Sequence, residues 1–134
     1  MASIKDVEGI GKVYAEKLSA AGVKTTGALL EKAASPKGRQ QLAEKAGVSE
    51  KLILEWANHV DLYRIKGVGS EYSDLLEEAG VDTVVELANR KPENLLQAMA
   101  EANAKKKLVR KMPSIGQVTD WVAQAKKLPR ALTY

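Results

Sequence analysis

The sequence of 134 residues contains no cysteine and no phenylalanine, and aromatic residues make up only 4% of it. Without cysteine the chain can form neither a disulfide nor a thiolate metal site, as expected for a protein of a reducing compartment. No apolar stretch has the length of a signal-peptide core or of a membrane span. These absences predict a cytoplasmic protein that does not interact with a membrane.

Residues that commonly carry catalysis are also scarce. His59 is the only histidine, and no ordered set of carboxylates accompanies it in the sequence. The chain has neither a phosphate-binding Walker loop nor a Gly-x-Ser-x-Gly nucleophile motif. The segment Gly9-Ile10-Gly11 is not a dinucleotide-binding motif, because no strand precedes it and no third glycine follows. We therefore expect a protein that is not an enzyme, with no catalytic residue, cofactor, bound metal or small-molecule substrate.

Charge is distributed unevenly along the chain, although the net charge is only +4. Residues 1–64 carry ten basic and eight acidic groups, residues 65–100 carry three and seven, and residues 101–134 carry eight and two. The middle of the chain is therefore acidic and its last third is basic. Such a basic segment indicates either a polyanionic or acidic partner, or the ordinary solvation of helix surfaces.

An internal duplication runs through the whole sequence. Val7-Glu8-Gly9-Ile10-Gly11 recurs 58 positions later as Ile65-Lys66-Gly67-Val68-Gly69. Towards the end of each copy the offset is 65, which aligns Trp56 with Trp121. The second copy therefore holds seven additional residues, located between Pro92 and Met112. The repeat predicts one unit over residues 1–62 and a second over 63–134, with a basic insertion near residues 100–112.

Both copies have the spacing of apolar residues that is typical of helices, and no stretch alternates with the period of a strand. Gly22 and Gly80 each stand where a left-handed residue would end a helix, with a valine after them, as in a Schellman motif. These patterns predict an all-α fold.

The last helix of each copy carries the matched tryptophan. Ser49 and Ser114 precede these helices at the position of an N-cap. Duplicated aromatic residues on apolar faces are expected in the core, and not as platforms for stacking nucleic-acid bases.

The glycine motif and the helix after it resemble the helix-hairpin-helix family. The first copy carries the resemblance in Gly9-Ile10-Gly11-Lys12-Val13-Tyr14-Ala15-Glu16-Lys17-Leu18. The continuation Ala21-Gly22-Val23-Lys24-Thr25-Thr26-Gly27-Ala28-Leu29-Leu30 is similar to the hairpin domain at the C-terminus of the bacterial RNA polymerase alpha subunit. The complete pattern resembles a bacterial family of uncharacterised tandem helix-hairpin-helix proteins. The resemblance implies two SAM-like orthogonal helical bundles, each opening with one hairpin.

The resemblance also implies a role for the two hairpins, residues 7–12 (hairpin one) and 65–70 (hairpin two). In many helix-hairpin-helix proteins the backbone N–H groups between the glycines bind a nucleic-acid phosphate without reading the bases. This role would fall on Gly9, Gly11, Lys12, Lys66, Gly67 and Gly69. The same glycines would be needed simply to turn tightly between packed helices, and with two glycines each, both hairpins should make the same turn. Hairpin one contains Glu8, and Glu71 follows hairpin two, so each also has an unfavourable charge.

Residues 105–111 (the basic run) contain five cations in seven positions. Phosphate contacts from such a run would give salt-dependent binding that is independent of sequence. Alternatively, the cations complement the dipole at the end of a solvated helix. The five cations are Lys105, Lys106, Lys107, Arg110 and Lys111.

Two functions from different classes follow from these features. The first is non-catalytic, sequence-independent DNA binding through the hairpins and the basic last third of the chain. The second is a protein-interaction or scaffolding module without direct nucleic-acid contact, which the acidic middle and the modest net charge favour. An accessory subunit of a nucleic-acid enzyme would combine the two.

Overall fold

The computed structural model describes residues 3–7 and 9–134, so Glu8 of hairpin one lies outside the described residues. The described chain contains one short 3-10 helix and eight α-helices, and its only extended pairing is an isolated bridge between Ser3 and Thr25. The prediction of an all-α fold is thereby confirmed. None of the described helices is long and apolar enough to cross a membrane.

The chain divides into two compact units. The first comprises Met1–Asp61 together with Ala131–Tyr134, and the second comprises Leu62–Arg130. The repeat placed residues 131–134 in the second unit, whereas in the structure these residues pack with the first. Sequence periodicity carries no information about this return, because the four residues have no counterpart in the first copy.

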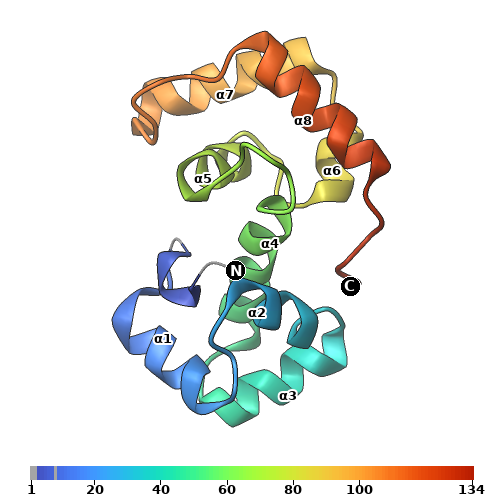
Figure 1. Ribbon diagram of the computed structural model, residues 1–134. Coiled ribbons are helices and arrows are strands. Elements are labelled where there is room, and N and C mark those ends of the chain that lie inside the picture. The colour runs from blue at the N-terminus through green and yellow to red at the C-terminus, as the bar shows by residue number, and fades with distance from the viewer. Residues whose placement is uncertain (1–2, 8) are drawn as a thin grey trace. The chain divides into compact units, whose positions relative to one another are not determined.

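The first unit contains five helical elements, shown from blue to green in Figure 1. The 3-10 helix η1 (Ile4–Asp6) and helix α3 (Pro36–Ala46) pack against α1 (Gly11–Ala20), and α2 (Thr26–Lys32) packs against α3. Helix α4 (Glu50–Leu62) completes the unit, and its last residue already belongs to the second. The core of the unit is formed by fully buried aliphatic side chains and one indole, including those of Ile10, Leu18, Leu29, Ile53 and Trp56.

The second unit contains four helices, shown from yellow-green to red in Figure 1. Helix α8 (Ile115–Lys127) packs against α6 (Val84–Ala88) and α7 (Pro92–Lys106), and α5 (Ser70–Glu78) packs against α7. One continuous cluster of buried side chains joins all four, with Leu75, Leu87, Leu95 and Trp121 among its members.

The helix ends follow the sequence closely. After α1 the backbone turns left-handed at Gly22 (φ 91°), and the Val23 N–H donates to the Leu18 carbonyl at 2.9 Å. After α5 the corresponding angle at Gly80 is 97°, and the Val81 N–H donates to the Leu76 carbonyl at 2.8 Å. Both are Schellman motifs, as predicted.

The predicted N-caps of α4 and α8 are also confirmed. The Ser49 Oγ accepts the Leu52 N–H at 3.1 Å, and the Ser114 Oγ accepts the Gln117 N–H at the same distance. At α8 the Gln117 side chain also accepts the Ser114 N–H at 2.8 Å, which completes a capping box.

The matched aromatic residues occupy equivalent places in the two units. Both tryptophans are only 2% exposed, which confirms that they are core residues. Trp56 packs at a tilt against Tyr14 with ring centroids 5.0 Å apart, and Trp121 against Tyr72 at 5.2 Å. Such tilted pairs stabilise a core beyond their buried area.

Residues 131–134 are held within the first unit by Arg39, which is 6% exposed. Its guanidinium donates to the Ala33 carbonyl at 2.9 Å and to the Thr133 carbonyl at 2.8 Å. The Thr133 N–H in turn donates to the Ala34 carbonyl, also at 2.8 Å. Two N–H groups of this largely buried guanidinium thus donate to carbonyls, one of them from the far end of the chain.

Candidate nucleic-acid interface

All eleven residues that the sequence places at a nucleic-acid interface are exposed in the structure. Lys12 follows Gly11, the first residue of α1, and Lys66 precedes Gly67 in the turn before α5. Lys105 and Lys106 form the last turn of α7, and Lys107 is its C-cap. Arg110 and Lys111 lie in the loop between α7 and α8.

The first glycine of each hairpin has the same conformation and the same neighbour. The φ angle is 88° at Gly9 and 98° at Gly67, a left-handed region in which glycine is strongly favoured. A Cβ at Gly9 would lie 3.5 Å from the Trp56 Nε1, and a Cβ at Gly67 would lie 3.0 Å from the Trp121 Nε1. Both glycines are therefore favoured by the backbone of the turn, and Gly67 also by the indole beside it, whether or not a phosphate binds there.

The second glycines differ, so the expectation that both hairpins make the same turn is wrong. Gly11 has a φ of 61° and already belongs to α1. Gly69 has a φ of −104° and is the extended N-cap of α5. The two helices therefore begin at different points of the motif, and only at Gly69 could another residue type adopt the backbone without strain.

Hairpin two is held in place by a residue that sequence reasoning missed. The Gln124 side chain of α8 accepts the Lys66 N–H at 2.9 Å and donates to the Lys66 carbonyl at 3.1 Å. Its amide nitrogen also donates to Asp120 at 2.9 Å. Gln124 stands one helical turn after Asp120 and could have been noticed only as a polar residue on the helix of Trp121. Both backbone groups of Lys66 are thus bonded to α8, which connects hairpin two to that helix.

The basic run is half helix and half loop. It leaves α7 at Lys107, which has a left-handed φ of 51°. Beyond it the buried Val109 is fixed by Asn103, whose Oδ1 accepts the Val109 N–H at 3.0 Å and whose Nδ2 donates to the Val109 carbonyl at 3.2 Å. The five cations are therefore displayed from an anchored loop and a helix end, and not from one continuous helical face.

One of these cations has a carboxylate partner. The Lys106 Nζ lies 2.9 Å from the Glu78 Oε1 at the end of α5. This hydrogen bond and the attraction of the Glu78 charge raise the pKa of Lys106 above its usual value. Lys106 is consequently less available to an external anion than the other members of the run.

The loop returns along α5 towards hairpin two. Tyr72, the third residue of α5, donates its hydroxyl hydrogen to the Lys111 carbonyl at 3.0 Å. The basic run thus extends from Glu78 at one end of α5 to Tyr72 near the other. Within the second unit, the structure brings Lys111 close to the start of α5, which Gly69 caps.

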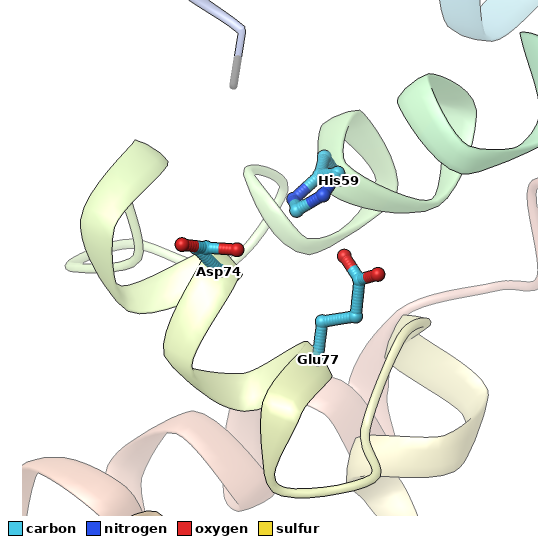
Figure 2. A group of neighbouring side chains, drawn as sticks. All are labelled: His59, Asp74 and Glu77. Atoms are coloured by element: carbon cyan, nitrogen blue, oxygen red, sulfur yellow. The ribbon is translucent and has the colours of Figure 1, made fainter. Parts of the chain in front are cut away.

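Figure 2 labels His59, Asp74 and Glu77. His59 lies on α4 and belongs to the first unit, whereas Asp74 and Glu77 lie three residues apart on α5 in the second. Residues at this spacing share one side of a helix, so the two carboxylates make that side of α5 acidic. Because the imidazole and the carboxylates come from different units, we assign no metal site to them.

In a comparison with known protein families, residues 8–128 match a domain of unknown function designated DUF4332. The chain belongs to this family. The DUF4332 match covers the glycines of both motifs, both tryptophans and the basic run. No curated protein and no solved structure matches the chain.

Proposed function

We propose that this DUF4332 protein is a non-catalytic DNA-binding protein that contacts backbone phosphates without reading sequence. The proposal retains the likeness of the two glycine motifs to helix-hairpin-helix proteins as an interpretation of the sequence. The observation that carries it is the hydrogen bond from Tyr72 to the Lys111 carbonyl. This bond connects the loop that carries Arg110 and Lys111 to the first turn of α5.

The chemistry of that surface suits a phosphate. The first N–H groups of α5 lack helical partners and carry the positive end of the helix dipole. Lys66 in the preceding turn and Lys111, whose carbonyl accepts the Tyr72 hydroxyl hydrogen, add positive charge, whereas Glu71 in the first turn opposes it. The contacts would be made to the nucleic-acid backbone and would therefore be strongly dependent on salt.

The first unit contributes a second, separate surface. Lys12 is exposed in the first turn of α1, where a cation can meet an anion bound at the helix start. No ion pair of the described residues involves Lys12, in contrast to Lys106. Each unit therefore has its own candidate for a phosphate contact.

The experiment that tests the proposal is a binding titration by fluorescence anisotropy. Labelled duplex and single-stranded DNA of several unrelated sequences are titrated with the protein at 50 and 200 mM salt. We expect affinities that are similar between sequences and that fall steeply with salt. Absence of binding at the lower salt concentration would refute the proposal.

A second candidate function, a protein-interaction module, is favoured by the acidic side of α5. Glu71, Glu77 and Glu78 are exposed on this helix. A basic protein partner would be recognised by such a surface through complementary charge. Two results together would favour this alternative. Charge reversal at Asp74 and Glu77 would abolish capture of a protein partner, and Lys12→Glu would leave the DNA affinity unchanged.

A further inference from the structure

A groove in the first unit lies between η1 and the outer face of α1, both shown in blue in Figure 1. Its volume is about 360 Å³, at the lower end of the range of ligand-binding pockets. Three lysines from three separate segments line it, namely Lys5 of η1, Lys12 of α1 and Lys24 of the turn after α1. The rest of the lining is Ser3, Ile4, Ala15, Glu16 and Ser19.

The walls of the groove are held by backbone contacts and buried side chains. The Ile4 N–H donates to the Lys24 carbonyl at 3.4 Å, and Ser3 forms an isolated antiparallel bridge with Thr25. The Ile4 side chain is only 2% exposed, so it anchors η1 to the core. The backbone that frames the groove is therefore in place before any ligand arrives.

The charge of the groove favours an anion. The lining carries three ammonium groups and one carboxylate, that of Glu16. None of the ion pairs recorded for the described residues involves Lys5, Lys12 or Lys24. Serine hydroxyls at positions 3 and 19 add hydrogen-bond donors that can reach a phosphate oxygen. An ammonium group without a carboxylate partner can bind a phosphate without first breaking an ion pair.

The duplication provides an internal comparison. At the offset of 58, Lys12 corresponds to Ser70, Lys24 to Asp82 and Ser19 to Glu77. Lys5 corresponds to Tyr63, and Glu16 to Asp74. The second copy therefore has no cation at any of these positions. Because both copies keep the same helix ends and aromatic pairs, the positive charge of the groove is not required by the shared fold.

We propose that this groove binds consecutive phosphates of a nucleic-acid strand, with Lys5 and Lys24 extending the contact that Lys12 makes at the start of α1. The inference rests on the proposed DNA-binding function and adds Lys5 and Lys24 to it. It also places a phosphate site in the first unit, although the basic last third of the chain lies largely in the second.

The test compares two double variants with equal loss of charge. Lys5→Gln/Lys24→Gln removes two cations from the groove, and Lys37→Gln/Lys51→Gln removes two exposed cations of the first unit outside it. We expect the groove variant to bind labelled DNA about tenfold more weakly than the control variant at 50 mM salt. We also expect its log–log salt slope to be less steep than that of the wild type by about 2. Circular dichroism and thermal unfolding establish that both variants are folded.

The outcomes separate this inference from the proposed function. If the wild type binds DNA and the two double variants bind equally well, the groove is not a phosphate site, while the proposed function stands. If the wild type does not bind DNA, both proposals fail. Inorganic phosphate is titrated as a third arm, with amide shifts of residues 3–5 and 24 as the readout. Binding of inorganic phosphate as tight as that of DNA at equal phosphate concentration would make the groove a small-anion site and overturn the inference.

Discussion

At the scale of single residues, a close geometric constraint lies between a glycine and an indole. A side chain at Gly67 meets an unfavourable φ of 98° and would also place its Cβ 3.0 Å from the Trp121 ring. At Gly9 the φ is similarly unfavourable, but the distance to Trp56 is an ordinary 3.5 Å. The two equivalent glycines therefore differ in how closely they are packed.

This difference predicts unequal costs for the same substitution. We expect Gly9→Ala to lower the free energy of unfolding by about 1–2 kcal/mol through backbone strain alone. Gly67→Ala should cost about 1–3 kcal/mol more, because the buried indole must also shift. Urea denaturation followed by tryptophan fluorescence measures both costs. For comparison, Trp56→Ala and Trp121→Ala should each lower the free energy of unfolding by roughly 3–5 kcal/mol. Equal costs for the two glycine variants would contradict the assigned packing.

The Lys106–Glu78 pair makes a second prediction at this scale. Because the Glu78 carboxylate raises the pKa of Lys106, Glu78→Gln should return that pKa towards the ordinary value for lysine. The raised pKa means that the pair stabilises the fold below the unfolded-state pKa of lysine, and that this contribution is lost as the pH rises through the folded-state pKa. An NMR titration of the Lys106 side chain at alkaline pH, in the wild type and in Glu78→Gln, checks the shift.

At the scale of the element, the two helix starts offer different probes of the proposed phosphate contact. Gly69 has an extended backbone, and nothing lies within 4 Å of a Cβ built on it. We expect Gly69→Ala to change the free energy of unfolding by no more than about 0.5 kcal/mol. DNA binding should nevertheless weaken, since the methyl group obstructs close approach of a phosphate to the start of α5. Anisotropy and urea denaturation of the same preparation measure the two effects, and unchanged DNA affinity would remove hairpin two from the interface.

The two helix starts, at α1 and α5, have the same number of glycines but differ in the charges that follow them. Lys12 follows the second glycine of hairpin one, whereas Ser70 and Glu71 follow that of hairpin two. We expect Lys12→Glu to weaken DNA binding at least fivefold with the fold intact, and Glu71→Lys to strengthen it by a similar factor. Two charges 4 Å apart at an effective dielectric of 20 interact by about 4 kcal/mol, and solvent and salt screen exposed groups. A quarter of that energy, about 1 kcal/mol, corresponds to a fivefold change in affinity. Affinities that do not respond to either reversal would count against the hairpins.

At the scale of the whole molecule, the uneven distribution of charge determines how salt affects binding. If the five cations of the basic run and Lys12 all contact phosphates, about six contacts give a log–log salt slope of roughly −5. The ion pair of Lys106 with Glu78 should reduce this number by about one contact, and neutralising the basic run should make the slope shallower without changing sequence preference. Titrations at four salt concentrations measure the slope, and an affinity indifferent to salt would exclude phosphate binding by the run.

The sequence alone determined the features that depend on neighbouring residues. The helix ends at Gly22 and Gly80 and the caps at Ser49 and Ser114 are local, because each hydrogen bond joins groups no more than five residues apart. The burial of Trp56 and Trp121 followed from their matched places on apolar helix faces. The candidate site residues were also identified from the sequence, since glycine motifs and runs of lysine are visible in it.

Only the tertiary structure decided which distant groups meet. The contact between Tyr72 and Lys111 spans 39 positions and the clamp of Gln124 on Lys66 spans 58, and neither has a signal in composition or periodicity. The bond from Arg39 to Thr133 and the ion pair of Lys106 with Glu78 also have no signal in the sequence. Nor does the groove that Lys5, Lys12 and Lys24 line. The type of a side chain determines which ligands the residue can bind. Whether the residue is available to an external ligand depends on the partner that helix packing places beside it.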